Sequence, residues 1–205
     1  MSVRKKSALL IFILLLIDQI TKIYVKLNFT IGESVDVLSW FKISFIENEG
    51  AAFGLQVVGK LFLTIFRIVA VVVLAIFTHR LIMRKARAGY IYTISLLLAG
   101  AAGNILDSVF YGLIFSESTF SQVATLVPFG TGYTSLFHGK VVDMFFFPIL
   151  KNSNGTTLFF NYIFNVADSC VTVSAFLLFI FYRKDLNESL EKKESQKKDE
   201  EIVQA

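Results

Sequence analysis

The chain has 205 residues, 55% of them hydrophobic, with 22 phenylalanines and only two prolines; this composition excludes an ordinary soluble domain and is typical of a bundle of membrane helices. The lone Cys170 excludes an internal disulfide and a cysteine-rich metal site. The formal net charge of +4 needs no nucleic-acid partner, because most of the Lys and Arg residues lie where they orient membrane helices.

Four segments have the roughly 20 apolar residues that a helix needs to cross the hydrocarbon core of a membrane: 8–25, 61–82, 91–114 and 157–182. They predict an all-α membrane protein with four transmembrane helices, in one domain over residues 1–182, followed by a charged tail over residues 183–205. The first segment follows a basic stretch, as a signal peptide would. No small-x-small cleavage site comes after it, so we interpret it as a retained helix.

The basic residues also predict the orientation of these helices. They concentrate before the first span, between the second and third spans, and in the tail. Because cytoplasmic segments carry an excess of Lys and Arg, both termini are expected in the cytoplasm. The two long connections, residues 28–58 and 115–156, are then expected on the outer side.

The first outer connection carries a strand signal. Apolar and polar residues partly alternate from Val35 to Ile46, which favours one or two short strands. Trp40 fits the aromatic belt of a membrane interface. We therefore expect a small β-sheet on the outer face of the membrane, and an extended loop in the second outer connection.

Charged residues inside the first span need an explanation. Asp18 and Lys22 are four residues apart and share one helix face. A neutralising ion pair is the usual way in which charges are tolerated in a membrane. The alternative is that this pair supports a functional site.

The third and fourth spans each present a polar stripe. In the third, Gly100 allows close helix contact, while Asn104 and Asp107, at helical spacing from it, need partners within the bundle. In the fourth, the stripe recurs at i, i+4, i+7 and i+11, on Asn161, Asn165, Asp168 and Thr172. Hydrogen bonding between helices would explain the stripe without any chemistry.

Asp143 and Asp168 both lie inside apolar sequence. An aspartate at a helix centre costs about 2.5 to 3.5 kcal/mol on insertion, so a functional role is the default hypothesis. Asp143 precedes a run too short to span, which we expect to dip into the outer interface; the alternative is a turn aspartate facing water. Two carboxylates that share one proton could activate water for peptide hydrolysis.

Five short blocks follow one another along the chain: D-Q-I-T-K at 18–22, N-E-G-A-A-F-G at 48–54, G-A-A-G-N-I-L-D at 100–107, G-K-V-V-D at 139–143 and F-N-V-A-D-S at 164–169. In these blocks the chain resembles the lipoprotein signal peptidases (signal peptidase II), which are bacterial membrane aspartyl peptidases. The resemblance implies that Asp143 and Asp168 are the catalytic pair. It also implies that seven residues support the site or contact the substrate: Asp18, Lys22, Asn48, Gly50, Asn104, Asp107 and Asn165.

The same resemblance implies the reaction and its setting. The substrate would be a prolipoprotein with a diacylglyceryl group on its lipobox cysteine, cleaved just before that cysteine to release the signal peptide. The enzyme would lie in the bacterial cytoplasmic (inner) membrane, with its active site toward the periplasmic leaflet. We expect membrane lipid around it, no nucleic acid, and no metal or other cofactor. No oligomeric partner is implied, so a monomer is expected.

Two features depart from the family pattern. Ser108 stands where the family has an arginine directly after the aspartate of its third block, and Arg67 is a candidate to supply that missing charge. The connection between the third and fourth blocks is also longer than usual. Residues 113–138 look like an inserted outer loop, for which a lid over the site is one interpretation.

Two rival functions use the same acidic residues differently. A small proton- or ion-coupled transporter would need a polar track across the whole membrane. A non-catalytic assembly subunit would use the acids only to pair with Lys22 and Arg67, and it would tolerate the loss of Asp143.

Overall fold

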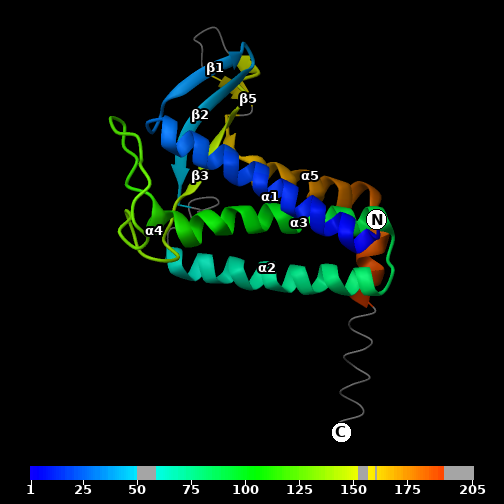
Figure 1. The fold of residues 1–205 in the computed structure, drawn as a ribbon. Helices are drawn as coiled ribbons and strands as arrows, with labels where there is room; N and C mark the ends of the chain where they lie inside the picture. The colour runs from blue at the N-terminus through cyan, green and yellow to red at the C-terminus, as the bar shows by residue number, and fades with distance from the viewer. Residues whose placement is uncertain (50–58, 152–156, 160, 192–205) are drawn as a thin grey trace.

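The computed structural model describes residues 1–49, 59–151, 157–159 and 161–191. Four long helices run alongside one another, with a small β-sheet standing at one end (Figure 1): α1 Val3–Asn28, α2 Lys60–Met83, α3 Ala88–Leu106 and α5 Val166–Phe181. Helix α3 is central, because it packs against each of the other three. A π-helical turn, η3 Asp107–Tyr111, and the short α4 Gly112–Ile114 extend α3 toward the sheet end.

The main sheet is antiparallel and has the strand order β1-β2-β3-β6. Its strands are β1 Ser34–Leu38, β2 Phe41–Asn48, β3 Val141–Phe146 and β6 Ile163–Phe164. A second, two-stranded sheet pairs β4 Leu150–Lys151 with β5 Thr157–Phe159. The strands predicted in the first connection are confirmed as β1 and β2. Strand β3 was not predicted from the sequence. Asp143 and the start of the apolar run after it form this strand, which pairs with β2.

The predicted fourth span, residues 157–182, begins too early. Residues 157–159 and 163–164 form strands, and the helix starts only at Val166. The reason is local: Asn165 caps the helix through its side chain, while β6 pairs with β3 just before it. Asn161 therefore precedes the helix, and the four-residue stripe expected there is not one continuous helical stripe.

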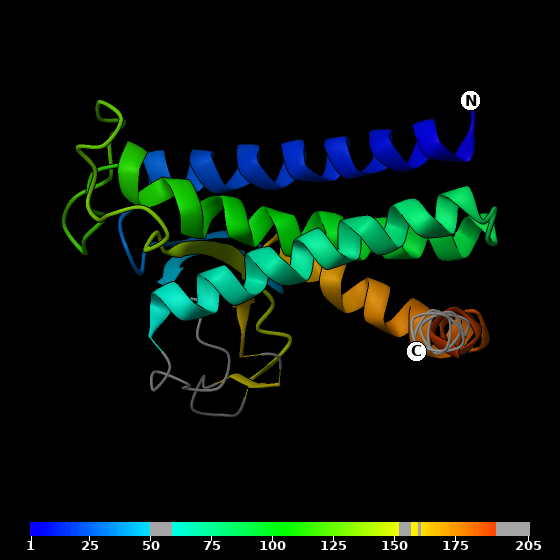
Figure 2. The same cartoon turned by 90° about the horizontal axis from the view of Figure 1, so that it is seen from below.

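The helices have the length and apolar character of membrane spans. Among the described residues, three stretches are long and apolar enough to span a membrane alone: α1, α2 and the continuous stretch Ala88–Ile114. Helix α5 counts as a fourth only together with the helix Arg183–Glu191, from which it is bent by 86°. The first residues of the predicted tail are thus helical, and Figure 2 shows this segment turning away from α5.

Two glycines of α3 allow the close packing that the sequence suggested. A Cβ atom on Gly103 would lie 2.6 Å from the carboxylate Oδ2 of Asp18 in α1. One on Gly100 would lie 2.9 Å from the Cβ of Cys170 in α5. Both separations are too short for carbon, so α3 can approach its neighbours this closely only without side chains here.

The loop 113–138 is tied to the end of α3 and to α2. Backbone hydrogen bonds join Val127 to Ile114 and Tyr133 to Phe115, and the Thr64 hydroxyl of α2 donates to the Phe137 carbonyl over 3.0 Å. These contacts anchor the loop at both ends. No hydrogen bond in the described part of the chain joins this loop to Asp143 or Asp168, so the lid interpretation stays a prediction.

Candidate active site

Asp143 and Asp168 lie on neighbouring elements at the junction of sheet and helices. Asp143 is in β3 and is only 2% exposed, while Asp168 lies in the first turn of α5. The Nδ2 of Asn165 donates to Asp143 Oδ1 over 2.6 Å, and the Nδ2 of Asn104 donates to Asp168 Oδ1 over 2.7 Å. The two asparagines are themselves bonded, since Asn165 Nδ2 lies 3.0 Å from Asn104 Oδ1. An amide bridge therefore links the two carboxylates.

Asn165 holds this arrangement at the start of α5. Its side-chain oxygen accepts the backbone N–H of Asp168 over 2.9 Å, and the Asp168 carboxylate accepts the backbone N–H of Asn165 over 3.4 Å. This reciprocal pair is a capping box, which fixes where the helix begins. It leaves Asp168 near the positive end of the helix dipole, where a negative charge is stabilised.

Asn48 and Gly50, in the motif block at 48–54, were also predicted to support the site. The Nδ2 of Asn48, at the end of β2, donates to Asp143 Oδ2 over 3.4 Å. Strand β2 brings it there, because it pairs with β3 beside Asp143. Gly50 lies outside the described residues, so its predicted role stays a prediction.

A buried cluster of charged residues, Asp18, Lys22 and Asp107, contacts the amide bridge through Asn104. Lys22 of α1 is fully buried, with its Nζ 3.0 Å from Asp18 and 2.8 Å from Asp107. The same Nζ donates to Asn104 Oδ1 over 2.8 Å, which fixes the amide that holds Asp168. The ion pair expected within the first span is present, and it also connects three helices to the candidate site.

Gln19 and Tyr111 belong to this cluster and were missed by the sequence analysis. The side-chain amide of Gln19 donates to Asp18 over 3.1 Å and to Asp107 over 3.0 Å, and its oxygen accepts the Tyr111 hydroxyl over 3.1 Å. Gln19 lies inside the first motif block, between the two charges. Its uncharged side chain gave no reason to select it.

The acids of the cluster also hold the elements that carry the two aspartates. The backbone N–H of Ala167 in α5 donates to Asp18 Oδ1 over 2.9 Å, and that of Val142 in β3 donates to Asp107 Oδ2 over 3.3 Å. Each of these donors is next in sequence to Asp168 or Asp143. The cluster therefore positions both aspartates through the backbone.

The electrostatics of Asp143 differ from those of an exposed carboxyl group. Burial, followed by the nearby charge of Asp168, raises the pKa of Asp143 from 3.8 to about 7. Its hydrogen bonds from Asn165 and Asn48 act in the opposite direction. A carboxyl group with this pKa can keep its proton near neutral pH.

The residue that departs from the family pattern is buried within the same layer. Ser108 is 2% exposed, and its hydroxyl donates to the Asn104 carbonyl over 3.0 Å. On the other side of the site, the guanidinium group of Arg67 in α2 interacts electrostatically with Asp168. Arg67 thus provides a positive charge to the aspartate pair from a different helix.

A second buried cation, also missed, fixes the end of α1 next to the sheet. Lys26 is fully buried and forms an ion pair with Glu47 of β2, while its Nζ donates to Ser118 of the loop 113–138 over 3.0 Å. Lys26 lies four residues after Lys22, so both cations share one face of α1. That spacing was the available signal in the sequence. Lys26 connects the loop to the sheet through these two contacts.

No three His, Cys, Asp or Glu side chains among the described residues gather into a candidate metal site. The arrangement instead offers an acid with a raised pKa, a second carboxylate at a helix N-terminus, and amides that orient both. Such a pair can take a proton from water and supply one to a carbonyl oxygen or an amine.

Comparisons with known proteins show which family the chain resembles. The family model described as signal peptidase (SPase) II matches residues 10–183. A lipoprotein signal peptidase of Porphyromonas gingivalis is 41% identical over 201 residues, covering 93% of this chain and 88% of that protein. One of Amoebophilus asiaticus is 29% identical, covering 87% and 78%. A bacterial membrane enzyme solved by the in meso method at 2.3 Å resolution superposes with a TM-score of 0.61 and 26% identity, covering 90% of this chain and 91% of that one.

Proposed function

Because the chain belongs to the signal peptidase II family, we propose that it removes the signal peptide from diacylglyceryl-modified prolipoproteins, with Asp143 and Asp168 activating water. The enzyme is then an aspartyl endopeptidase of the bacterial inner membrane, and it cleaves just before the lipid-modified cysteine. The observation that carries the proposal is the amide bridge through Asn165 and Asn104, which holds the two carboxylates side by side.

We assign the roles of the two carboxylates from their surroundings. Asp143 is buried and has a raised pKa, which favours the protonated form at neutral pH, so we assign it as the general acid. Asp168 lies at a helix N-terminus, accepts a hydrogen bond from Asn104 and interacts with Arg67, and we assign it as the general base.

The steps of the reaction follow from these two roles. Asp168 takes a proton from water while the water oxygen attacks the scissile carbonyl carbon, and the Asp143 proton stabilises the developing oxyanion. The carbon–nitrogen bond then breaks, and the nitrogen of the cysteine leaves with a proton from Asp143. The proton held by Asp168 passes to Asp143, which restores the starting state.

The hydrogen bonds of Asp143 favour a peptidase over a non-catalytic assembly subunit. The amides of Asn48 and Asn165 donate to its carboxylate, and no ion pair of Asp143 occurs among the described residues. An assembly subunit gains nothing from a buried carboxyl group held in this way. A water-activating site needs one.

The test compares isosteric variants in a cleavage assay. Asp143→Asn and Asp168→Asn enzymes are purified in detergent and given a diacylglyceryl prolipoprotein, and the released signal peptide is measured by mass spectrometry. Both should lose activity, whereas Asp36→Asn, which changes an exposed carboxylate of β1, should retain it. Cleavage at the wild-type rate by either of the first two variants would overturn the assignment.

A further inference from the structure

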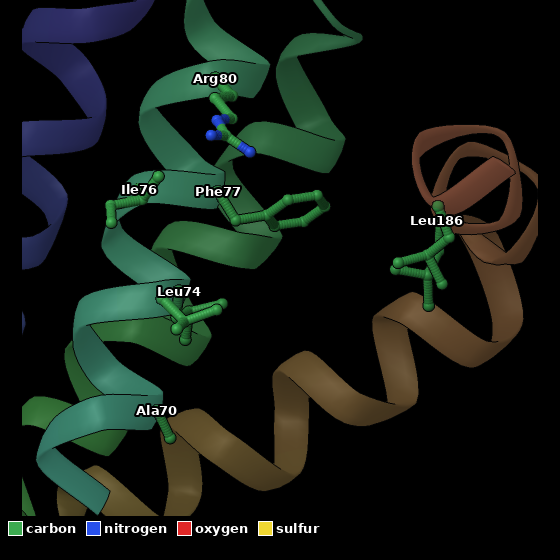
Figure 3. Close-up of a pocket in the computed structure, with 8 residues that line it drawn as sticks. Ala70, Leu74, Ile76, Phe77, Arg80 and Leu186 are labelled. Carbon is green, nitrogen blue, oxygen red and sulfur yellow. The ribbon is translucent and has the colours of Figure 1, made fainter. Parts of the chain in front are cut away.

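An apolar groove lies at the opposite end of the bundle from the aspartates. It has a volume of about 540 Å³ and runs between α2 and the helix Arg183–Glu191. Figure 3 shows Phe77 and Leu186 pointing toward one another across it. The lining residues are Ala70, Val73, Leu74, Ile76, Phe77, Arg80, Leu186 and Leu190. The volume is within the range of about 300 to 1,000 Å³ that small-molecule sites occupy.

The length of the groove matches one leaflet of a bilayer. Its α2 residues run from Ala70 to Arg80, and ten residues of helix rise about 15 Å. The hydrocarbon core of a bilayer is about 30 Å thick, so one leaflet accounts for about half of it. With Arg80 at the membrane surface, Ala70 lies at the midplane, and the groove has the reach of one acyl chain.

The surface end of the groove is positively charged. Arg80 closes the apolar lining, and no carboxylate lies within ion-pair distance of it in the described part of the chain. Arg84 and Arg87 line a neighbouring hollow together with Asp185 and Glu188, and Arg87 lies 3.8 Å from Asp185. Lys85, Arg183 and Lys184 are further basic residues of the two segments, and Glu191 is a further acid. Cations outnumber anions in these segments, and Arg80 is the charged residue that lines the groove itself, which suits a phosphate group.

The bent helix has the character of a segment that lies in the membrane surface. Leu186 and Leu190 are four residues apart and both face the groove, while charged or polar residues occupy the other positions of the helix. An 86° turn from α5 carries the helix across the direction of the span. It therefore covers the surface end of the groove rather than extending into water.

We propose that this groove is a binding site for one anionic phospholipid, with an acyl chain between α2 and the bent helix and the phosphate on Arg80. The site lies in the leaflet opposite to the aspartate pair and is independent of the peptidase reaction. The amino-terminal end of a signal peptide is a poor occupant, because its basic residues would lie against Arg80 and its basic neighbours.

The test uses two adjacent valines of α2. Val73 lines the groove and is 55% exposed, whereas Val72 is 52% exposed and does not line it. Val73→Trp fills the groove, and Val72→Trp adds the same side chain on another face. Arg80→Gln removes the charge at the surface end. Each full-length protein is transferred to nanodiscs that contain equal amounts of dioleoyl phosphatidylglycerol and phosphatidylcholine, and retained lipid is counted by native mass spectrometry after release.

The wild-type protein and Val72→Trp should each retain one phosphatidylglycerol, with at least a fivefold preference over phosphatidylcholine. Val73→Trp should retain none, and Arg80→Gln should bind both lipids alike. Equal retention by the two tryptophan variants would mean that only the general lipid shell is measured, which overturns the site. A preference that survives in Arg80→Gln overturns the role of Arg80. A photo-crosslinker at position 73 that captures a prolipoprotein instead of lipid would assign the groove to the peptide.

Discussion

Asn165 donates its side-chain amide to Asp143 over 2.6 Å while belonging to the helix start that carries Asp168. One residue therefore sets the position of both carboxylates. Asn165→Ala should lower the cleavage rate by about 10- to 100-fold, because a hydrogen bond to a charged or polar carboxyl group is worth about 1.5 to 3 kcal/mol. Steady-state cleavage of a diacylglyceryl prolipoprotein measures the loss. A fully active Asn165→Ala enzyme would show that the amide bridge is not needed.

Loss of Lys22 should be among the most destabilising single changes. Lys22→Met leaves Asp18 and Asp107 buried without their cation, at a cost of about 3 to 5 kcal/mol. Thermal unfolding in detergent measures it, with Lys42→Met as the control, because the Lys42–Asp36 ion pair is at the surface and is worth at most about 1 kcal/mol. Adding Asp107→Asn to Lys22→Met should recover part of the stability. Equal unfolding temperatures for Lys22→Met and Lys42→Met would contradict the cluster.

The raised pKa of Asp143 predicts a loss of activity on the alkaline side. The acid keeps its proton below about pH 7 and loses it above, so kcat/KM should fall as the pH rises through about 7. The folded pKa is above the ordinary value of 3.8, so the folded state binds more protons between these values and stability should also decline as the pH rises across them. Asp143→Asn should abolish the decline of stability with pH, which thermal unfolding between pH 4 and pH 7 measures. An unchanged decline would show that another group is responsible.

Arg67 should contribute to activity through its charge. Its guanidinium group interacts electrostatically with Asp168, so Arg67→Gln should lower kcat/KM for the diacylglyceryl prolipoprotein, whereas Arg67→Lys, which keeps the positive charge, should largely preserve it. Thermal unfolding of both variants checks that the fold is kept. A kcat/KM of Arg67→Gln equal to that of the wild-type enzyme would contradict this role.

The contact between Gly103 and Asp18 predicts a packing defect. A methyl group at position 103 would lie 2.6 Å from the Asp18 carboxylate. Gly103→Ala should therefore destabilise the bundle by about 1 to 3 kcal/mol, as overpacking does. Gly59→Ala tests a glycine with no atom within 4 Å but with positive φ, and so separates backbone strain from crowding. A Gly103→Ala protein as stable as the wild type would mean that α1 and α3 can move apart freely.

Much of the site could be predicted from sequence, because intramembrane charges are costly and few. The ion pair of Asp18 with Lys22 and the need of Asn104 and Asp107 for partners followed from helical spacing and burial, and the structure confirms both. The strand nature of Asp143 did not follow. Strand β3 pairs with β2, which lies about 95 residues earlier, and no local pattern specifies such a partner.

The start of α5 had a local signal that was available. Asn165 and Asp168 form an N-x-x-D sequence, which is typical of a helix N-terminus, yet the apolar run around them favoured a longer span. Gln19, which is half-buried, and Lys26, which is fully buried, were missed for another reason. An uncharged amide and a lysine near a helix end are both common at the surface, and only the packing shows the polar partners that they contact inside the protein.

Helix α5 is shorter than the membrane that it would cross. Its 16 residues rise about 24 Å, against a hydrocarbon core of about 30 Å. A bilayer next to so short a segment can thin to match it. In the proposed mechanism, the scissile bond would then meet the aspartates in a local depression of the membrane, where water is nearer than elsewhere at that depth. Bilayer thickness would thus be a determinant of turnover, and longer-chain lipids should slow cleavage without altering any residue.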